Sequence, residues 1–259
     1  MGSEMCIRDR LKQMNDEGHA IQLHLHPHWL DSSYDGVEWK MDTRRYRLHQ
    51  WADSEIASVV KQSVEWIFTK IGVRADVFRA GGWCIQPFEK LRDSLAACGI
   101  LTDSTIYRNG YLSTSTHFFD FRKAPQKDQW RFDADPCIED EEGRFLEIPI
   151  TAKWIGPWSF WSIAVKRLAY KERAFGDGRA VGGGKYRKLK LLTFGDIMPL
   201  SLDSERHQWI EQQIASFLKK KISCICVISH PKAISKEALQ TLEMVIEKNG
   251  AKIQFTSIS

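Results

Sequence analysis

The chain has 259 residues, 43% of them hydrophobic, which is enough for one domain with a sizeable core. Its net charge of +4 is mildly basic, and without a long basic run or an aromatic-interleaved basic motif we expect no nucleic-acid partner. The most apolar segment, residues 154–165, is too short to cross a membrane, and six cysteines without a Cys-x-x-Cys pair favour a reduced, cytoplasmic chain.

Residues 2–9, Gly-Ser-Glu-Met-Cys-Ile-Arg-Asp, resemble the translated end of a transposon used to prepare sequencing libraries. We therefore interpret residues 1–10 as a foreign junction and exclude them from fold reasoning. We then expect that Met1 is not a native start and that the natural protein continues upstream. Residues 11–17 are predicted to be the tail of a helix that Gly18 stops. We expect residues 11–259 to form one domain.

Four of the eight histidines lie between Gly18 and Trp29. Aliphatic residues alternate with polar ones here, which predicts a strand over residues 20–26 that ends at Pro27. His24 and His28 at the end of such a strand are candidate ligands for zinc or another divalent metal. Two ligands do not complete a catalytic zinc site, which normally has three, and the alternative is a polar strand edge whose histidines face water.

The next elements alternate between helix and strand patterns. A buried stripe predicts a helix from Asp53 or Ser54 to about Ile71, and Gly72 stops it. A strand over 73–78, a helix opened by Gln86-Pro87 and a strand over 100–106 follow. This alternation predicts an α/β fold with parallel strands and helical crossovers.

The second half of the chain is less regular. Residues 107–146 are predicted to be irregular, and residues 145–152 are β-like. Residues 154–175 are rich in Trp and are predicted to be helix or loop. Residues 173–190 are predicted to be a flexible loop with a triple glycine at 182–184. The last predicted elements are a helix within 200–221 capped by Asp203 or Ser204, a strand over 222–229 covered on both faces, a helix from Ser235 to Gly250, and a strand over 252–256.

The pattern Gly-His-x-Ile-x-x-His-x-x-x-His, residues 18–28, resembles the metal-binding motif of the polysaccharide deacetylases, the NodB-like carbohydrate esterases. In that family both histidines of the last pair bind a divalent metal, usually zinc, so the resemblance implies this role for His24 and His28. It also implies a distorted, incomplete (β/α) barrel. His26, an additional neighbour, and Trp83 are expected to contact substrate.

Three further motifs of the family follow in order, in residues 78–83, 103–105 and 228–231. The resemblance implies that Arg79 orients the catalytic base and that His230 is the general acid. Asp103 matches the strand-end aspartate motif weakly. Each residue also has a simpler interpretation. Arg79 could form an ion pair at the surface, His230 could be a hydrogen-bonded histidine at a strand end, and Asp103 could be a turn cap.

The family's strand with two adjacent aspartates, one the catalytic base and one the third metal ligand, has no counterpart between Met1 and Gly18. We therefore expect a domain that lacks its first strand and that is inactive alone. Residues 145–151 also resemble a strand of the surface-polysaccharide branch.

The implied function is metal-dependent removal of acetyl groups from an N- or O-acetylated polysaccharide of the cell envelope, as in lipopolysaccharide biosynthesis. The alternatives are a hydrolase of a non-carbohydrate amide on the same scaffold and a catalytically silent carbohydrate-binding protein.

Overall fold

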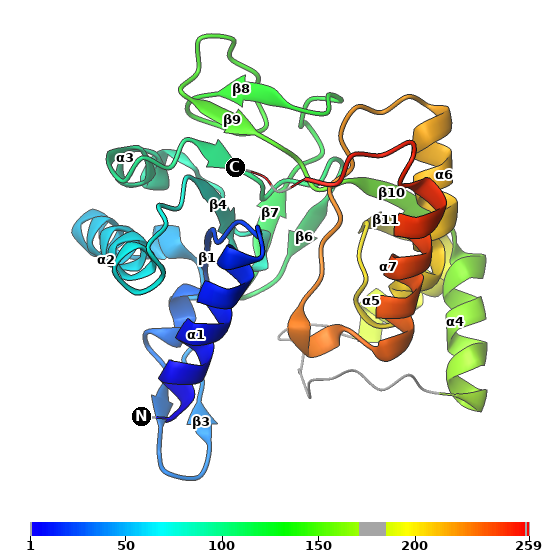
Figure 1. Cartoon of the computed structure of the whole chain (residues 1–259), viewed down its shortest axis with the longest axis horizontal. Coiled ribbons are helices and arrows are strands. Elements are labelled where there is room, and N and C mark those ends of the chain that lie inside the picture. Colours follow the sequence, from blue (N-terminus) through cyan, green and yellow to red (C-terminus); the bar gives the residue numbers. More distant parts are fainter. Residues whose placement is uncertain (1, 171–184, 257, 259) are drawn as a thin grey trace. The chain divides into compact units, whose positions relative to one another are not determined.

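A computed structural model describes residues 2–170, 185–256 and 258 (Figure 1). The chain contacts divide it into two compact units, which are described separately. Unit 1 comprises residues 1–106, 111–148 and 256–259, and unit 2 comprises residues 107–110 and 149–255. The prediction of a single domain over residues 11–259 stays a prediction.

Unit 1 contains a central sheet flanked by helices. Its helices are α1 (Gly2–Asp16), α2 (Asp53–Ile71) and α3 (Glu89–Ala97), with short 3-10 turns η1 (Pro27–Trp29), η2 (Leu48–Gln50) and η3 (Gly81–Trp83). Its strands are β1 (Leu23–Leu25), β2 (Ser33–Tyr34), β3 (Trp39–Lys40), β4 (Val77–Ala80), β5 (Thr102–Asp103), β6 (Tyr111–Ser113), β7 (Phe118–Asp120), β8 (Trp130–Phe132) and β9 (Phe145–Glu147).

The central sheet has the order β1-β4-β5-β9-β8. The pairs β1/β4, β4/β5 and β5/β9 are parallel, and β8 is antiparallel to β9. The predicted α/β class with parallel strands is therefore confirmed for this unit. β1 and β8 are the edges of this sheet, and its closure into a barrel stays a prediction.

The helices of unit 1 form where their sequence predicts. In α2 the buried positions recur at helical spacing, at Ile56, Val60, Val64, Ile67 and Ile71, and Gly72 ends the helix with φ +93°. Ala52, not Asp53 or Ser54, precedes its first turn, and its N–H donates to the Glu55 carboxylate at 2.9 Å. Gly18 likewise follows α1 with φ +90°.

Unit 2 contains β10 (Ala152–Ile155), α4 (Pro157–Ala169), α5 (Lys185–Phe194), β11 (Asp196–Pro199), η4 (Ser204–Trp209), α6 (Ile210–Lys219), η5 (Pro231–Ala233) and α7 (Lys236–Asn249). β10 and β11 form an antiparallel pair. Ser235 caps α7 as predicted, since its hydroxyl accepts from the Ala238 N–H at 3.1 Å. The predicted loop with the glycines at 182–184 lies outside the described residues, and 185–194 is helical.

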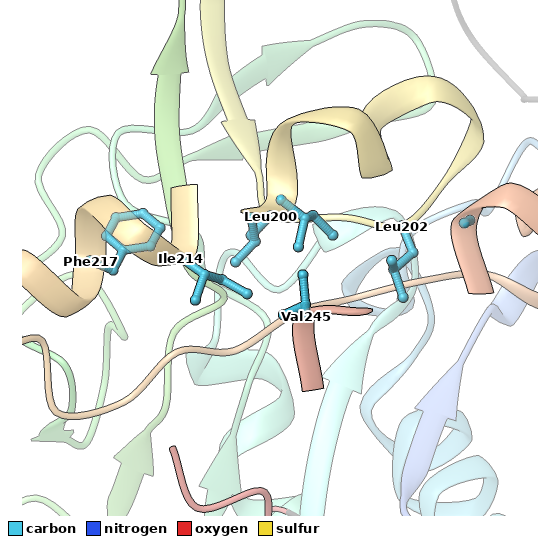
Figure 2. Packing of buried hydrophobic residues seen from close by; sticks show 7 residues of the cluster. Leu200, Leu202, Ile214, Phe217 and Val245 are labelled. Carbon is cyan, nitrogen blue, oxygen red and sulfur yellow. The ribbon is translucent and has the colours of Figure 1, made fainter. Parts of the chain in front are cut away.

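The core of unit 2 lies between α6, α7 and the segment after β11. Figure 2 shows that its side chains meet from these three parts of the chain. The buried members are Leu200, Leu202, Ile210, Ile214, Phe217, Ala238 and Val245.

Two predicted strands are absent from the described residues. The segment 222–229 contains no strand, and its described pairing includes a parallel bridge between Ile228 and Ser201 and backbone bonds with Thr151, Leu200 and Leu202. Only Ile228 in it is buried, so the expected cover on both faces is wrong. Residues 252–256 are also not a strand, because Lys252 and Ile253 donate back to the Asn249 carbonyl.

Candidate functional site

Three histidines form a cluster at the carboxyl end of β1. The rings of His24 and His26 lie 4.7 Å apart, and those of His26 and His28 lie 5.5 Å apart. His24 lies in β1 and His26 follows the strand directly, whereas the predicted strand extended to residue 26; η1, which begins at Pro27, brings His28 into the same cluster. His28 is the most enclosed of the three, with 3% of its surface exposed.

Pairing between strands fixes the orientation of His24. Parallel register places His24 opposite Arg79 of β4, and its Nδ1 lies 2.8 Å from the Arg79 carbonyl oxygen. A carbonyl accepts only, so Nδ1 carries the proton and Nε2 keeps its lone pair. This is the tautomer that metal-ligating histidines adopt when a backbone carbonyl holds the other nitrogen.

Two residues that the sequence analysis did not single out extend the cluster. Tyr46 stacks on His28 with ring centroids 4.5 Å apart, and its hydroxyl lies 2.9 Å from Nε2 of His117. Burial raises the pKa of Tyr46 to about 12, so it is neutral at pH 7 and has a proton to donate. No signal in the sequence links these positions, which are 71 residues apart.

The glycine pair after β4 allows this close packing. A Cβ at Gly81 would lie 2.3 Å from the Leu25 carbonyl oxygen and 2.7 Å from Nδ1 of His26. A Cβ at Gly82 would lie 2.8 Å from the His117 ring, and Gly82 has φ +63°. Both positions therefore require glycine.

Trp83 follows with φ +60°, which is uncommon for a large side chain and is a form of strain found at functional sites. Its ring contacts Phe119 edge-on at 5.9 Å. The expected substrate contacts of Trp83 and His26 stay predictions.

Arg79 is held by the end of the neighbouring strand. Its Nε donates to the Ser104 carbonyl at 2.6 Å and its Nη2 donates to the Ser104 hydroxyl at 2.8 Å. These bonds fix the guanidinium near the end of β4 in unit 1. The predicted role in orienting a catalytic base is not decided by these contacts.

Asp103 makes the contacts of a turn cap. Its carboxylate accepts from the Thr105 N–H at 3.0 Å and from the Thr105 hydroxyl at 2.7 Å. It is 1% exposed and lies opposite Glu147 of β9, which is fully buried. Glu147 in turn accepts from the Ile106 N–H at 3.1 Å.

Burial raises the pKa of both carboxyls of this pair. Hydrogen bonds to Asp103 partly offset the effect of burial on its pKa, whereas the adjacent Asp103 charge raises the pKa of Glu147 further, to well above its ordinary value. Two adjacent buried carboxyls cannot both ionise readily, so we assign the proton to Glu147 and the charge to Asp103. Glu147 was not among the residues predicted from the sequence. Its place at the end of a strand beside Asp103 becomes visible only once β5 and β9 are paired.

In unit 2, His230 forms a dyad with Asp203, which the sequence analysis considered only as a helix cap. Nδ1 of His230 lies 2.7 Å from the Asp203 carboxylate, which also accepts from the His230 N–H at 2.8 Å and from the Ser229 hydroxyl at 3.1 Å. Burial acts to raise the pKa of Asp203, but these hydrogen bonds outweigh it and hold the pKa below its ordinary value. The signal for Asp203 was its position directly after the apolar residues Leu200 and Leu202.

The dyad has the parts of a general acid. An ionised carboxylate that accepts from Nδ1 fixes the ring tautomer, so that Nε2 is the nitrogen that exchanges a proton. The His230 side chain is 40% exposed and therefore accessible, whereas that of Asp203 is 12% exposed. The role of His230 as the general acid stays a prediction.

An apolar pocket of about 520 Å³ lies along the outer edge of β1. It lies between this strand, α1 and α2, and its lining includes His24, His26, Trp29 and Trp66. Within the described parts of the chain, no three His, Cys, Asp or Glu side chains are arranged to hold a metal ion. The His24 tautomer suits a metal ligand, but the ligand set described is incomplete.

No family model matches the chain, and the comparison with curated proteins gives no match. Among solved structures it is similar to a candidate polysaccharide deacetylase from Mycobacterium smegmatis, at 13% identity and TM-score 0.48, over 95% of this chain and 61% of that one. It is also similar to a GH57 branching enzyme from Thermococcus kodakaraensis in complex with glucose, at 11% identity and TM-score 0.47, over 97% of this chain. The chain thus spans 61% and 48% of their lengths, and at these TM-scores neither likeness assigns a family or an activity to it.

Proposed function

We propose that the chain carries the metal-binding histidines and the general acid of a divalent-metal-dependent hydrolase that removes acetyl groups from an N- or O-acetylated cell-envelope polysaccharide. The observation that carries this proposal is the cluster of His24, His26 and His28, with His24 held by a carbonyl as the Nδ1–H tautomer. The order of the sequence motifs supports the choice of substrate.

In this proposal His24 and His28 hold zinc or another divalent metal through neutral imidazole nitrogens. The bound metal would polarise the acetyl carbonyl and lower the pKa of a water. His230 protonates the departing amine or alcohol through Nε2, and Asp203 keeps the ring in the required tautomer. Arg79 orients the catalytic base, and Asp103 with its partner Glu147 supports the strand ends beside it.

The remaining ligand and the base would come from a strand added at the open edge of β1. Among the residues that the structure describes, β1 pairs with β4 on one side only, and its outer edge lines the apolar pocket. A strand that paired there in parallel would end beside His24, since parallel strands have their carboxyl ends at one edge of a sheet. Two adjacent aspartates at that end would supply both missing groups.

A second candidate is a catalytically silent carbohydrate-binding protein. It is favoured by the incomplete ligand set among the described residues. Exposed aromatic rings suited to stacking on sugars are present in unit 1 at Trp29, Tyr34 and Trp39, which contact one another. This reading predicts sugar binding that is independent of zinc.

Acetate release distinguishes the two candidates. We compare residues 1–259 with a form extended upstream from the native coding sequence, on acetylated chitin oligosaccharides and O-acetylated polysaccharides, with and without zinc. The proposal predicts release by the extended form only and a loss of about 10²–10⁴-fold in the His230→Ala variant of that form.

His19→Ala is the matched control, because His19 lies in the same segment as His24 but outside the cluster of His24, His26 and His28. This variant of the extended form should keep its activity. An extended form that binds sugar and releases no acetate at any zinc concentration would establish the binding protein instead. Full activity of residues 1–259 alone would show that an internal carboxylate serves as base.

A further inference from the structure

Helix α4 of unit 2 has an apolar face that points away from the unit. The face consists of Trp158, Trp161, Val165 and Leu168, whose spacings of three, four and three residues place them on one side of the helix. Trp158 is 84% exposed and Leu168 is 88% exposed. Of the residues of α4, all of which are described, none is buried.

The opposite face of α4 packs against the rest of unit 2. The Phe160 ring contacts the Trp209 ring edge-on, with centroids 5.4 Å apart. The Arg167 guanidinium forms a bidentate ion pair with the Glu205 carboxylate, which is nearly buried. These contacts with Trp209 and Glu205 do not involve Trp158, Val165 or Leu168.

Helix α5 extends the apolar surface. It packs beside α4, and Nε1 of Trp161 donates to the Leu192 carbonyl at 2.9 Å. Phe194 of α5 is 75% exposed, and Leu189 is also exposed. Exposed apolar side chains on two adjacent helices form the kind of continuous patch that marks an interaction surface.

This surface is also the basic part of the chain. Helices α4 and α5 together contain six Lys and Arg residues and no Asp or Glu, whereas the whole chain has a net charge of only +4. The remainder of the chain is therefore acidic overall. Lys188 of α5 is exposed beside Leu189. Basic side chains next to exposed tryptophan and leucine match the chemistry of an anionic lipid surface.

We propose that the α4–α5 surface docks unit 2 on the surface of an anionic phospholipid bilayer. Trp158, Val165, Leu168 and Phe194 insert at the level of the headgroups, and the basic side chains contact lipid phosphates. The docking is peripheral: no helix in the described part of the chain combines the length and apolar character needed to span a bilayer. It does not depend on the proposed hydrolase activity.

Vesicle co-sedimentation of the full chain tests the docking. We expect binding to vesicles of phosphatidylcholine mixed with phosphatidylglycerol, little binding to phosphatidylcholine alone, and release at high salt. Trp158→Ser with Leu168→Ser should weaken binding about tenfold or more, and Lys188→Gln about fivefold. All three residues are exposed, and circular dichroism checks that the variants are folded.

Ile138→Ser is the matched control, because Ile138 is an exposed aliphatic residue of unit 1, at 63% exposure. This variant should bind vesicles as the unmodified chain does. No sedimentation with anionic vesicles would overturn the proposal, as would equal binding by the Trp158/Leu168 double variant. If light scattering instead shows a dimer that Leu168→Ser converts to a monomer, without vesicle binding, the face is an interface between copies and the proposal is wrong.

Discussion

Replacing Asp203 with alanine tests the His230 dyad. The change removes the acceptor of three hydrogen bonds, from the His230 ring, the His230 N–H and the Ser229 hydroxyl. Hydrogen bonds to a charged group contribute about 1.5–3 kcal/mol each, but water can replace part of them because the ring is accessible. We expect the free energy of unfolding of unit 2 to fall by about 3 kcal/mol at pH 7.

The effect should depend on pH with a defined sign. Hydrogen bonding holds the pKa of Asp203 below its unfolded value, so its contribution is present above that value and is lost as the pH falls through the folded pKa. The difference between Asp203→Ala and the unmodified chain should therefore shrink below about pH 4.

Urea denaturation followed by circular dichroism measures this difference. A loss of about 3 kcal/mol corresponds to a midpoint lower by roughly 1–3 M urea. Glu211→Ala is the control, because Glu211 forms an exposed ion pair with Lys248 and should cost less than about 1 kcal/mol. A loss in Asp203→Ala below about 0.5 kcal/mol at pH 7, or one that is unchanged at pH 3, would refute the reasoning.

Two further changes test unit 1. At pH 5, Glu147→Gln should have nearly the same free energy of unfolding as the unmodified chain, because Glu147 is protonated. As the pH rises through the raised pKa of Glu147, the unmodified chain should lose stability and the variant should not. Parallel stability-against-pH curves for both proteins would contradict the assignment of the proton. Gly82→Ala should lower the free energy of unfolding by about 1–3 kcal/mol, because its φ is +63° and its Cβ would meet the His117 ring. An unchanged urea midpoint would show that the loop adapts.

Local signals explain which elements the sequence predicted well. Helices α2 and α7 carry their own buried stripes and stops or caps, so Gly72 and Ser235 mark their limits without knowledge of the fold. The parallel order of β1, β4 and β5 followed from the alternation of strand and helix patterns. The strand predictions for residues 222–229 and 252–256 were wrong, because an apolar run becomes a strand only where a partner strand pairs along it.

The candidate site was predictable only in part. The clustering of His24 with His26 follows from strand alternation, whereas Tyr46 and His117 join the site through a contact that no short-range pattern encodes. Asp203 was taken as a cap because it precedes a helical turn, and in the structure its carboxylate turns to His230.

Calorimetric titration with zinc tests the central claim most directly. The full chain should bind one zinc ion weakly, with a dissociation constant on the order of micromolar or larger, because two imidazoles lack the carboxylate that offsets the charge of the ion. His24→Ala should abolish this binding and His19→Ala should preserve it. Equal zinc binding by His24→Ala and the unmodified chain, or no binding by either, would contradict the proposed metal site.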